Sequence, residues 1–175
     1  MNHFDQAVAV VLRHEGSTYT DSPTDHGGPT KYGLTLHDLK LAGLASDKPT
    51  LQALTEAQAR GIYSVVFWDP EHYGDLNSVE LATCVFDQRV LGGPTAVADL
   101  QNLLGCRPDG VLGLLTASAA NRADGADLAL RFLRSRAQYY IKIAKNSPDQ
   151  LEWVGGWVDR LWDLAYTLFL GSKLP

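Results

Sequence analysis

One boundary constrains the fold of this chain more than any other feature. Residues 3–14 are predicted to form an amphipathic helix, because their apolar side chains recur with the 3.6-residue period of an α-helix. Gly16 is well placed to end it, since glycine is common just past a last helical turn. Residues 17–30 are dense in Ser, Thr, Asp, Gly and Pro, which excludes a buried helix and favours turns. The carboxyl group of Glu15 therefore lies where apolar sequence gives way to polar sequence.

The polar segment predicts a small β-hairpin lobe. Short strands at 18–21 and 31–34, joined by a turn at 25–28, would form this lobe beside the end of the first helix. Such a lobe would be one wall of a cleft.

Carboxyl groups near this cleft suggest glycosidase chemistry. Cleavage of a glycosidic bond needs one carboxylic acid that protonates the leaving oxygen and a second group on the opposite face. Glu15 is the candidate acid, and Asp25 or Asp21 with Thr30 could orient a water. Each of them alone could also be an ordinary surface, turn or capping residue.

Most of the remaining chain is predicted to be helical from its apolar periodicity and its cap residues. The expected helices are 36–42, 56–68, 78–90, 96–104, 116–120, 124–145 and a last helix that starts at 147. Tyr63 and Trp68 are either core aromatics or a wall on which a sugar ring could stack. The basic residues of the long helix are interpreted as a solvated face, and they are Arg131, Arg134, Arg136, Lys142 and Lys145.

Composition excludes several classes of protein. The formal net charge of -5 argues against broad neutralisation of nucleic-acid phosphates. Four charged residues interrupt the apolar segment 151–170, so no stable membrane insertion is expected. Cys84 and Cys106 fit no metal-finger spacing and are expected to be free thiols. The first residues lack the basic region of a signal peptide, so a dedicated release route is expected.

A zinc enzyme is the main competing chemistry. Four histidines crowd the first part of the chain, and they are His3, His14, His26 and His37. No HExxH motif accompanies them, so neither a metal nor another cofactor is expected.

Two ordered sets of motifs extend along the chain. The first set is His14-Glu15-Gly16, Tyr19-Thr20-Asp21, Asp25-His26-Gly27-Gly28-Pro29-Thr30-Lys31-Tyr32-Gly33-Leu34-Thr35, and Tyr63 followed by Phe67-Trp68-Asp69-Pro70. It resembles the glycoside hydrolase family 108 lysozymes, which are N-acetylmuramidases found among phage endolysins and secretion-associated proteins. The second set is Leu100-Gln101, Leu104-Gly105, Asp109-Gly110-Val111-Leu112-Gly113, Arg136-Ala137, Tyr140, Gly156-Trp157 and Arg160. It resembles the predicted peptidoglycan-binding region that follows such lysozymes.

The resemblance implies a mainly α-helical, lysozyme-like fold with a small β-hairpin lobe beside the active-site cleft. It implies a catalytic region at 1–91 and a helical peptidoglycan-binding-like region at 92–175, packed into one globular unit. The implied partner is the peptidoglycan glycan strand, cleaved by a monomer at the β-1,4 bond between N-acetylmuramic acid and N-acetylglucosamine. The implied place of action is the periplasm or cell wall, after synthesis in the cytoplasm and holin-type or other release.

By this resemblance Glu15 matches the catalytic glutamate of the family. Asp25 and Thr30, the other expected catalytic residues, are similar to the spaced Glu, Asp and Thr of phage lysozymes more generally. The expected substrate-binding residues are His14, Asp21, Tyr32, Tyr63, Trp68 and Asp87. Two positions depart from the family pattern: Ser17 replaces a glycine, and Leu91 replaces an asparagine. These departures keep open a non-catalytic peptidoglycan-binding or secretion-accessory protein, and an amidase or peptidase is a third, weaker alternative.

Overall fold

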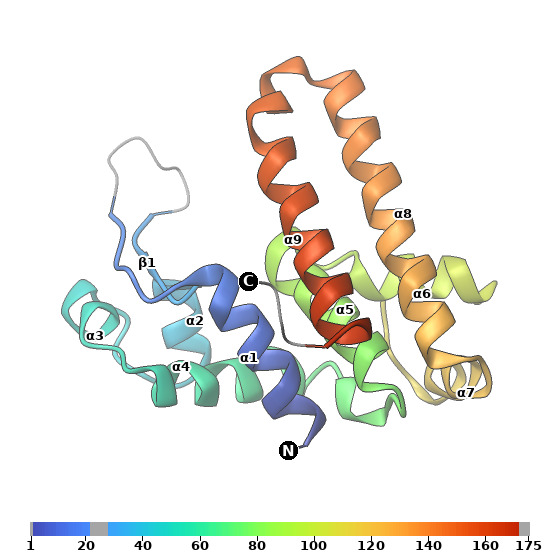
Figure 1. Cartoon of the computed structure of the whole chain (residues 1–175). Helices are drawn as coiled ribbons and strands as arrows, with labels where there is room; N and C mark the ends of the chain where they lie inside the picture. The colour runs from blue at the N-terminus through green and yellow to red at the C-terminus, as the bar shows by residue number, and fades with distance from the viewer. Residues whose placement is uncertain (1, 22–27, 172–175) are drawn as a thin grey trace. The chain divides into compact units, whose positions relative to one another are not determined.

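The computed structural model describes residues 2–21 and 28–171, and the chain is mainly α-helical (Figure 1). The expected mainly α-helical, lysozyme-like fold with a small β-hairpin is confirmed. Packing divides the chain into two compact units, Met1–Gly74 and Asp75–Pro175, which are described separately below. In the described part of the chain, no helix combines the length and the apolar character needed to span a membrane.

The first unit combines one hairpin with short helices. Its elements are α1 (His3–Glu15), β1 (Thr30–Lys31), β2 (Leu34–Thr35), α2 (Leu36–Leu41), α3 (Lys48–Gln52), α4 (Glu56–Tyr63), the π-helix η1 (Ser64–Trp68) and the 3-10 helix η2 (Tyr73–Asp75).

Helix α1 forms because both of its ends are capped and one of its faces is apolar. The Asn2 side chain accepts a hydrogen bond of 2.8 Å from the Asp5 amide, as an N-cap residue does. Ala7 and Val8 are completely buried. Gly16 has a φ of 69° and donates its N–H to the Leu12 carbonyl at 3.0 Å, so it ends the helix as predicted.

The hairpin strands are shorter than predicted, and the predicted turn at 25–28 lies outside the described residues except for Gly28. Strands β1 and β2 pair antiparallel, and Tyr32 and Gly33 are the two residues between them. The segment 31–34 is therefore not one continuous strand. The predicted strand at 18–21 is reduced to a single bridge between Thr20 and Thr30.

Polar caps set the starts of two further helices in this unit. Thr35 forms a capping box with Asp38 at the start of α2. Thr55 forms another with Gln58 at the start of α4. The helix predicted at 56–68 is α-helical only to Tyr63 and continues as the π-helix η1.

The second unit is a helical bundle. Its elements are α5 (Val79–Gly92), α6 (Ala96–Leu104), α7 (Leu114–Arg122), α8 (Gly125–Asn146), the 3-10 helix η3 (Pro148–Gln150) and α9 (Leu151–Phe169). Helix α5 is the centre of this bundle, since it packs on α6, α8 and α9. It is buried at eight consecutive positions, Leu81 to Gln88, because neighbours cover it on several sides. Cys84 on α5 is a free thiol whose burial raises its pKa, and Cys106 is free as well.

The loop before α7 shows how one amide group organises a turn. The Gln101 side chain donates to the Asp109 carboxylate at 2.8 Å and to the Val111 carbonyl at 3.0 Å. Its oxygen accepts from the Gly110 amide at 2.9 Å. Thr116, where the helix at 116–120 was predicted to start, is instead buried inside α7 and accepts a third hydrogen bond from Gln101.

Candidate active site

Glu15 is the last residue of α1, and its side chain is half-buried. Gly16 stops the helix directly after it, so the carboxyl group is presented at the end of a rigid element. The position agrees with the sequence-based prediction.

The turn of the hairpin packs against this carboxyl group. Tyr32 has a φ of 54° and Gly33 a φ of 72°, the left-handed pair that a two-residue hairpin turn of this twist requires. A Cβ atom on Gly33 would lie 2.7 Å from Glu15 Cγ and 2.8 Å from Glu15 Oε2. Glycine is therefore required at this position both for the backbone conformation and for the close approach to Glu15.

Tyr63 of α4 holds the same turn in place. Its hydroxyl group donates to the Tyr32 carbonyl at 2.8 Å, and it would lie 2.8 Å from a Cβ on Gly33. The Tyr63 side chain is completely buried, so no face of the ring is open to a sugar. The burial of Tyr63 does not agree with the expected sugar contact. Tyr63 instead positions the turn that packs against Glu15.

Trp68 is also a core residue in this structure. It is 5 % exposed and lies 5.5 Å from the Phe4 ring and 5.6 Å from the Tyr73 ring, measured between ring centroids. The π-helical turn η1 carries it inward. The expected sugar stacking on Trp68 therefore does not agree with its burial.

Thr30 lies on β1, next to the turn that contacts Glu15. Its hydroxyl oxygen is 2.7 Å from that of Thr20, and the two residues exchange backbone hydrogen bonds of 2.9 Å. Thr30 is thus fixed to the chain segment that leaves α1. Asp25, its predicted catalytic companion, lies outside the described residues.

Asp21 is engaged by residues away from Glu15. Its carboxylate accepts hydrogen bonds from Lys48 at 2.9 Å and from the Tyr19 hydroxyl at 3.3 Å. The hydrogen bond from Lys48 lowers the pKa of Asp21 below its ordinary value. The geometry therefore makes Asp21 an anchor between its loop and α3.

A pocket of about 330 Å³ lies beside the turn. Its lining includes Arg13 and Gly16 from the end of α1, Tyr32 from the turn, and Arg60 from α4. Glu56 at its rim is paired with Arg60 at 2.9 Å. Tyr32 is the predicted substrate-binding residue that the structure places in this pocket, and His14 is half-buried in the adjacent helical turn.

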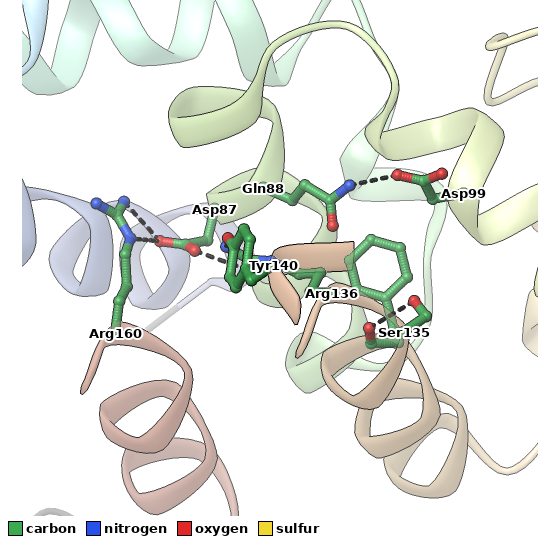
Figure 2. A network of polar contacts seen from close by, with 8 residues as sticks. Asp87, Gln88, Asp99, Ser135, Arg136, Tyr140 and Arg160 are labelled. Atoms are coloured by element: carbon green, nitrogen blue, oxygen red, sulfur yellow. Dashed lines mark hydrogen bonds and ion pairs between the residues drawn. The ribbon is translucent and has the colours of Figure 1, made fainter. Parts of the chain in front are cut away.

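Asp87, in the second unit, is a buried structural carboxylate. It is completely buried and accepts hydrogen bonds from Arg136 at 2.9 Å and from Arg160 at 2.7 and 2.9 Å (Figure 2). Burial alone would raise the pKa of Asp87, but the two guanidinium groups outweigh it and lower the pKa. The substrate contact expected for Asp87 is therefore excluded by its burial in this structure.

The basic residues of the long helix were predicted to form a solvated face, and for Arg136 this prediction is wrong. It is 3 % exposed, and besides Asp87 it donates to the Tyr140 hydroxyl at 3.2 Å. Tyr140 in turn lies 5.0 Å from the Trp157 ring, measured between ring centroids. The signal that could have revealed this network is the second motif set, which contains Arg136, Tyr140, Trp157 and Arg160 together.

The described residues contain no cluster of three or more His, Cys, Asp or Glu side chains that could hold a metal ion. Glu15, Tyr32, Gly33 and Tyr63 are the residues that the fold brings together. This arrangement can present one carboxyl group, fixed by a backbone turn, to a polar substrate.

Comparisons with known proteins agree with this picture. Residues 8–93 match the family described as glycosyl hydrolase 108, and residues 95–162 match the family described as predicted peptidoglycan domain. A solved structure of Brucella abortus SagA is similar over 98 % of this chain and 96 % of that chain, with 26 % identity and a TM-score of 0.79. No curated protein matches the chain. The resemblance drawn from the motifs is confirmed, and the matches support a glycoside hydrolase that acts on or binds peptidoglycan.

Proposed function

We propose that this protein, whose residues 8–93 belong to the glycosyl hydrolase 108 family, cleaves the β-1,4 bond between N-acetylmuramic acid and N-acetylglucosamine. Glu15 is the general acid. One observation carries the proposal: within the matched region, the Glu15 carboxyl group lies against the Tyr32–Gly33 turn at the end of α1.

The proposed chemistry assigns one role to each side of the bond. Glu15 donates its proton to the glycosidic oxygen while the bond to the anomeric carbon breaks, and the leaving sugar departs as an alcohol. Thr30 and Asp25 orient the water that adds to the remaining sugar, and the Asp25 carboxylate takes up the proton that this water loses. Asp25 is preferred to Asp21 for this role, because the Asp21 carboxylate already accepts hydrogen bonds from Lys48 and Tyr19.

The remaining parts of the chain have supporting roles in this proposal. His14 and Tyr32 contact the glycan, while Tyr63 positions the turn. Residues 1–91 form the catalytic region and residues 92–175 the binding region. The protein acts as a monomer in the periplasm or cell wall, after holin-type or other dedicated release.

Mass spectrometry of soluble fragments tests the assignment. Purified peptidoglycan is digested with wild type, with Glu15→Gln, and with Glu152→Gln, which changes an exposed glutamate on α9. Wild type and Glu152→Gln should release disaccharide-peptides with reducing N-acetylmuramic acid ends. Glu15→Gln should reduce the rate by about 10²- to 10⁴-fold, the range for loss of a general acid, with an unchanged melting temperature. Equal release by Glu15→Gln would refute Glu15 as the acid.

A non-catalytic peptidoglycan-binding or secretion-accessory protein is the second candidate. Ser17 and Leu91, which depart from the family pattern, favour it. Binding of folded wild type to purified cell walls without any release of reducing sugar would support this alternative.

A further inference from the structure

The second unit contains a pocket that the proposed hydrolysis does not use. Its volume is about 320 Å³, and it lies between α5, α6 and α8. Polar or aromatic residues from all three helices line it, and they include Gln88, Asp99, Asn102, Ser135, Arg136 and Tyr139. The three helices pack on one another, so the backbone around this pocket is held in place.

Gln88 and Arg136, two residues of this lining, each have a buried polar atom. Gln88 is 8 % exposed and donates its amide N–H to the Asp99 carboxylate. Figure 2 shows its amide oxygen pointing away from Asp99. Among the described residues, neither Gln88 Oε1 nor Arg136 Nε has a hydrogen-bond partner.

Such atoms are uncommon because a buried polar atom without a partner costs about 1–3 kcal/mol. Arg136 uses its two terminal nitrogens for Asp87 and Tyr140, which leaves its Nε–H as a donor. Gln88 Oε1 is an acceptor. One ligand group that carries both a donor and an acceptor would satisfy both atoms.

The aromatic residue of the pocket narrows the chemistry of the ligand. Tyr139 lines the pocket and is 60 % exposed, so much of its ring is accessible to a sugar. Asp99, Asn102 and Ser135 add oxygen and nitrogen atoms of the kinds that pair with hydroxyl groups.

We propose that this pocket binds the acetamido group of an N-acetylated amino sugar in the glycan strand. The acetamido N–H would donate to Gln88 Oε1, its carbonyl would accept from Arg136 Nε, and the sugar ring would lie against Tyr139. Each of the two atoms exposes less than 1 Å², so binding is accompanied by a small side-chain rotation. The choice of peptidoglycan as the source of this sugar rests on the proposed function.

The test measures binding rather than hydrolysis. Full-length Glu15→Gln protein is labelled for NMR and titrated with chitotriose, which has three β-1,4-linked N-acetylglucosamine units. Cellotriose, with the same rings and linkage but no acetamido group, is the matched control ligand. Backbone signals of Asn102, Leu103 and Ser135 should shift with chitotriose and stay unchanged with cellotriose.

Variants then separate the pocket from other sugar sites. Gln88→Met and Tyr139→Ala should each weaken chitotriose binding at these signals about tenfold, the effect of losing roughly one good contact. Trp153→Ala, which removes an aromatic ring that is 56 % exposed on α9, should leave binding unchanged. If Gln88→Met does not fold, the test rests on Tyr139→Ala, which changes an exposed residue.

Equal shifts with both sugars, shifts confined to residues around Glu15, or unaltered binding in both variants would overturn the proposal. Pocket binding by a protein that releases no reducing sugar would support this inference and reject the proposed hydrolysis. Hydrolysis without binding in the pocket would support the proposed hydrolysis and reject this inference.

Discussion

Glu15 and Asp87 are two carboxyl groups that the same chain treats in opposite ways. Glu15 is half-buried and lies against the backbone of a hairpin turn. Asp87 is completely buried between two guanidinium groups. The proposed catalytic carboxyl group is positioned by a glycine-containing turn, whereas Asp87 is held in ion pairs that join α5 to α8 and α9.

The largest effect on stability is expected from Asp87→Asn. This change leaves two buried guanidinium groups with one neutral amide, and breaking a buried ion pair costs about 3–5 kcal/mol. Urea unfolding at pH 7 measures the loss. Asp159→Asn, an exposed position on α9, is the matched control and should change the free energy of unfolding little. If Asp87→Asn lowered the free energy of unfolding no more than this control, Asp87 would not have the structural role that distinguishes it from Glu15.

Protonation of Asp87 at low pH should lower the stability of wild type by no more than the Asp87→Asn substitution does. The folded pKa of Asp87 is lowered, so its stabilisation is present above the unfolded pKa of about 3.9 and is lost as pH falls below it. The melting temperatures of wild type and Asp87→Asn should therefore converge as pH decreases below about 4. A constant difference down to the lowest accessible pH would contradict the lowered pKa.

A smaller effect on stability, with a large one on activity, is expected from Gly33→Ala. An alanine at this positive φ costs about 1–2 kcal/mol. Its methyl group would also displace Glu15, and a shift of about 1 Å in a reacting group can cost about 10²-fold in rate. Gly43→Ala is the control, since Gly43 has a φ of 74° and a Cβ added there would meet no atom within 4 Å. Similar rates for the two variants would show that contact with Glu15 is unimportant.

The smallest effect is expected from Tyr63→Phe. It removes one hydrogen bond to the Tyr32 carbonyl, worth about 1 kcal/mol, and loosens the turn beside Glu15. Peptidoglycan release should fall less than in Gly33→Ala. Tyr73→Phe, which removes another buried tyrosine hydroxyl from the same unit, should lose similar stability and keep full activity.

The parts of the fold that were predicted depend on local sequence. The end of α1 follows from an apolar stripe and Gly16, and the start of α4 follows from a Thr55 capping box. Glu15 could be singled out for the same reason, since its place at a helix end is a local property.

The parts that were not predicted depend on contacts between distant residues. The turn at Tyr32–Gly33 puts a tyrosine at positive φ, which is rare, and its hydrogen bond comes from Tyr63, 31 residues away. Arg136 and Arg160 meet Asp87 across 49 and 73 residues. No periodicity within one helix could reveal that Arg136 faces a buried partner.

The Tyr32–Gly33 turn has a consequence for protein engineering. The carboxyl group of Glu15 packs so closely on Gly33 that a side chain at position 33 would displace it. A selection for altered wall specificity should therefore keep Thr30, Gly33 and Tyr63 constant and randomise Lys31 of β1. Such a library changes the surface of the hairpin and leaves the proposed catalytic residues and the turn beside Glu15 unaltered.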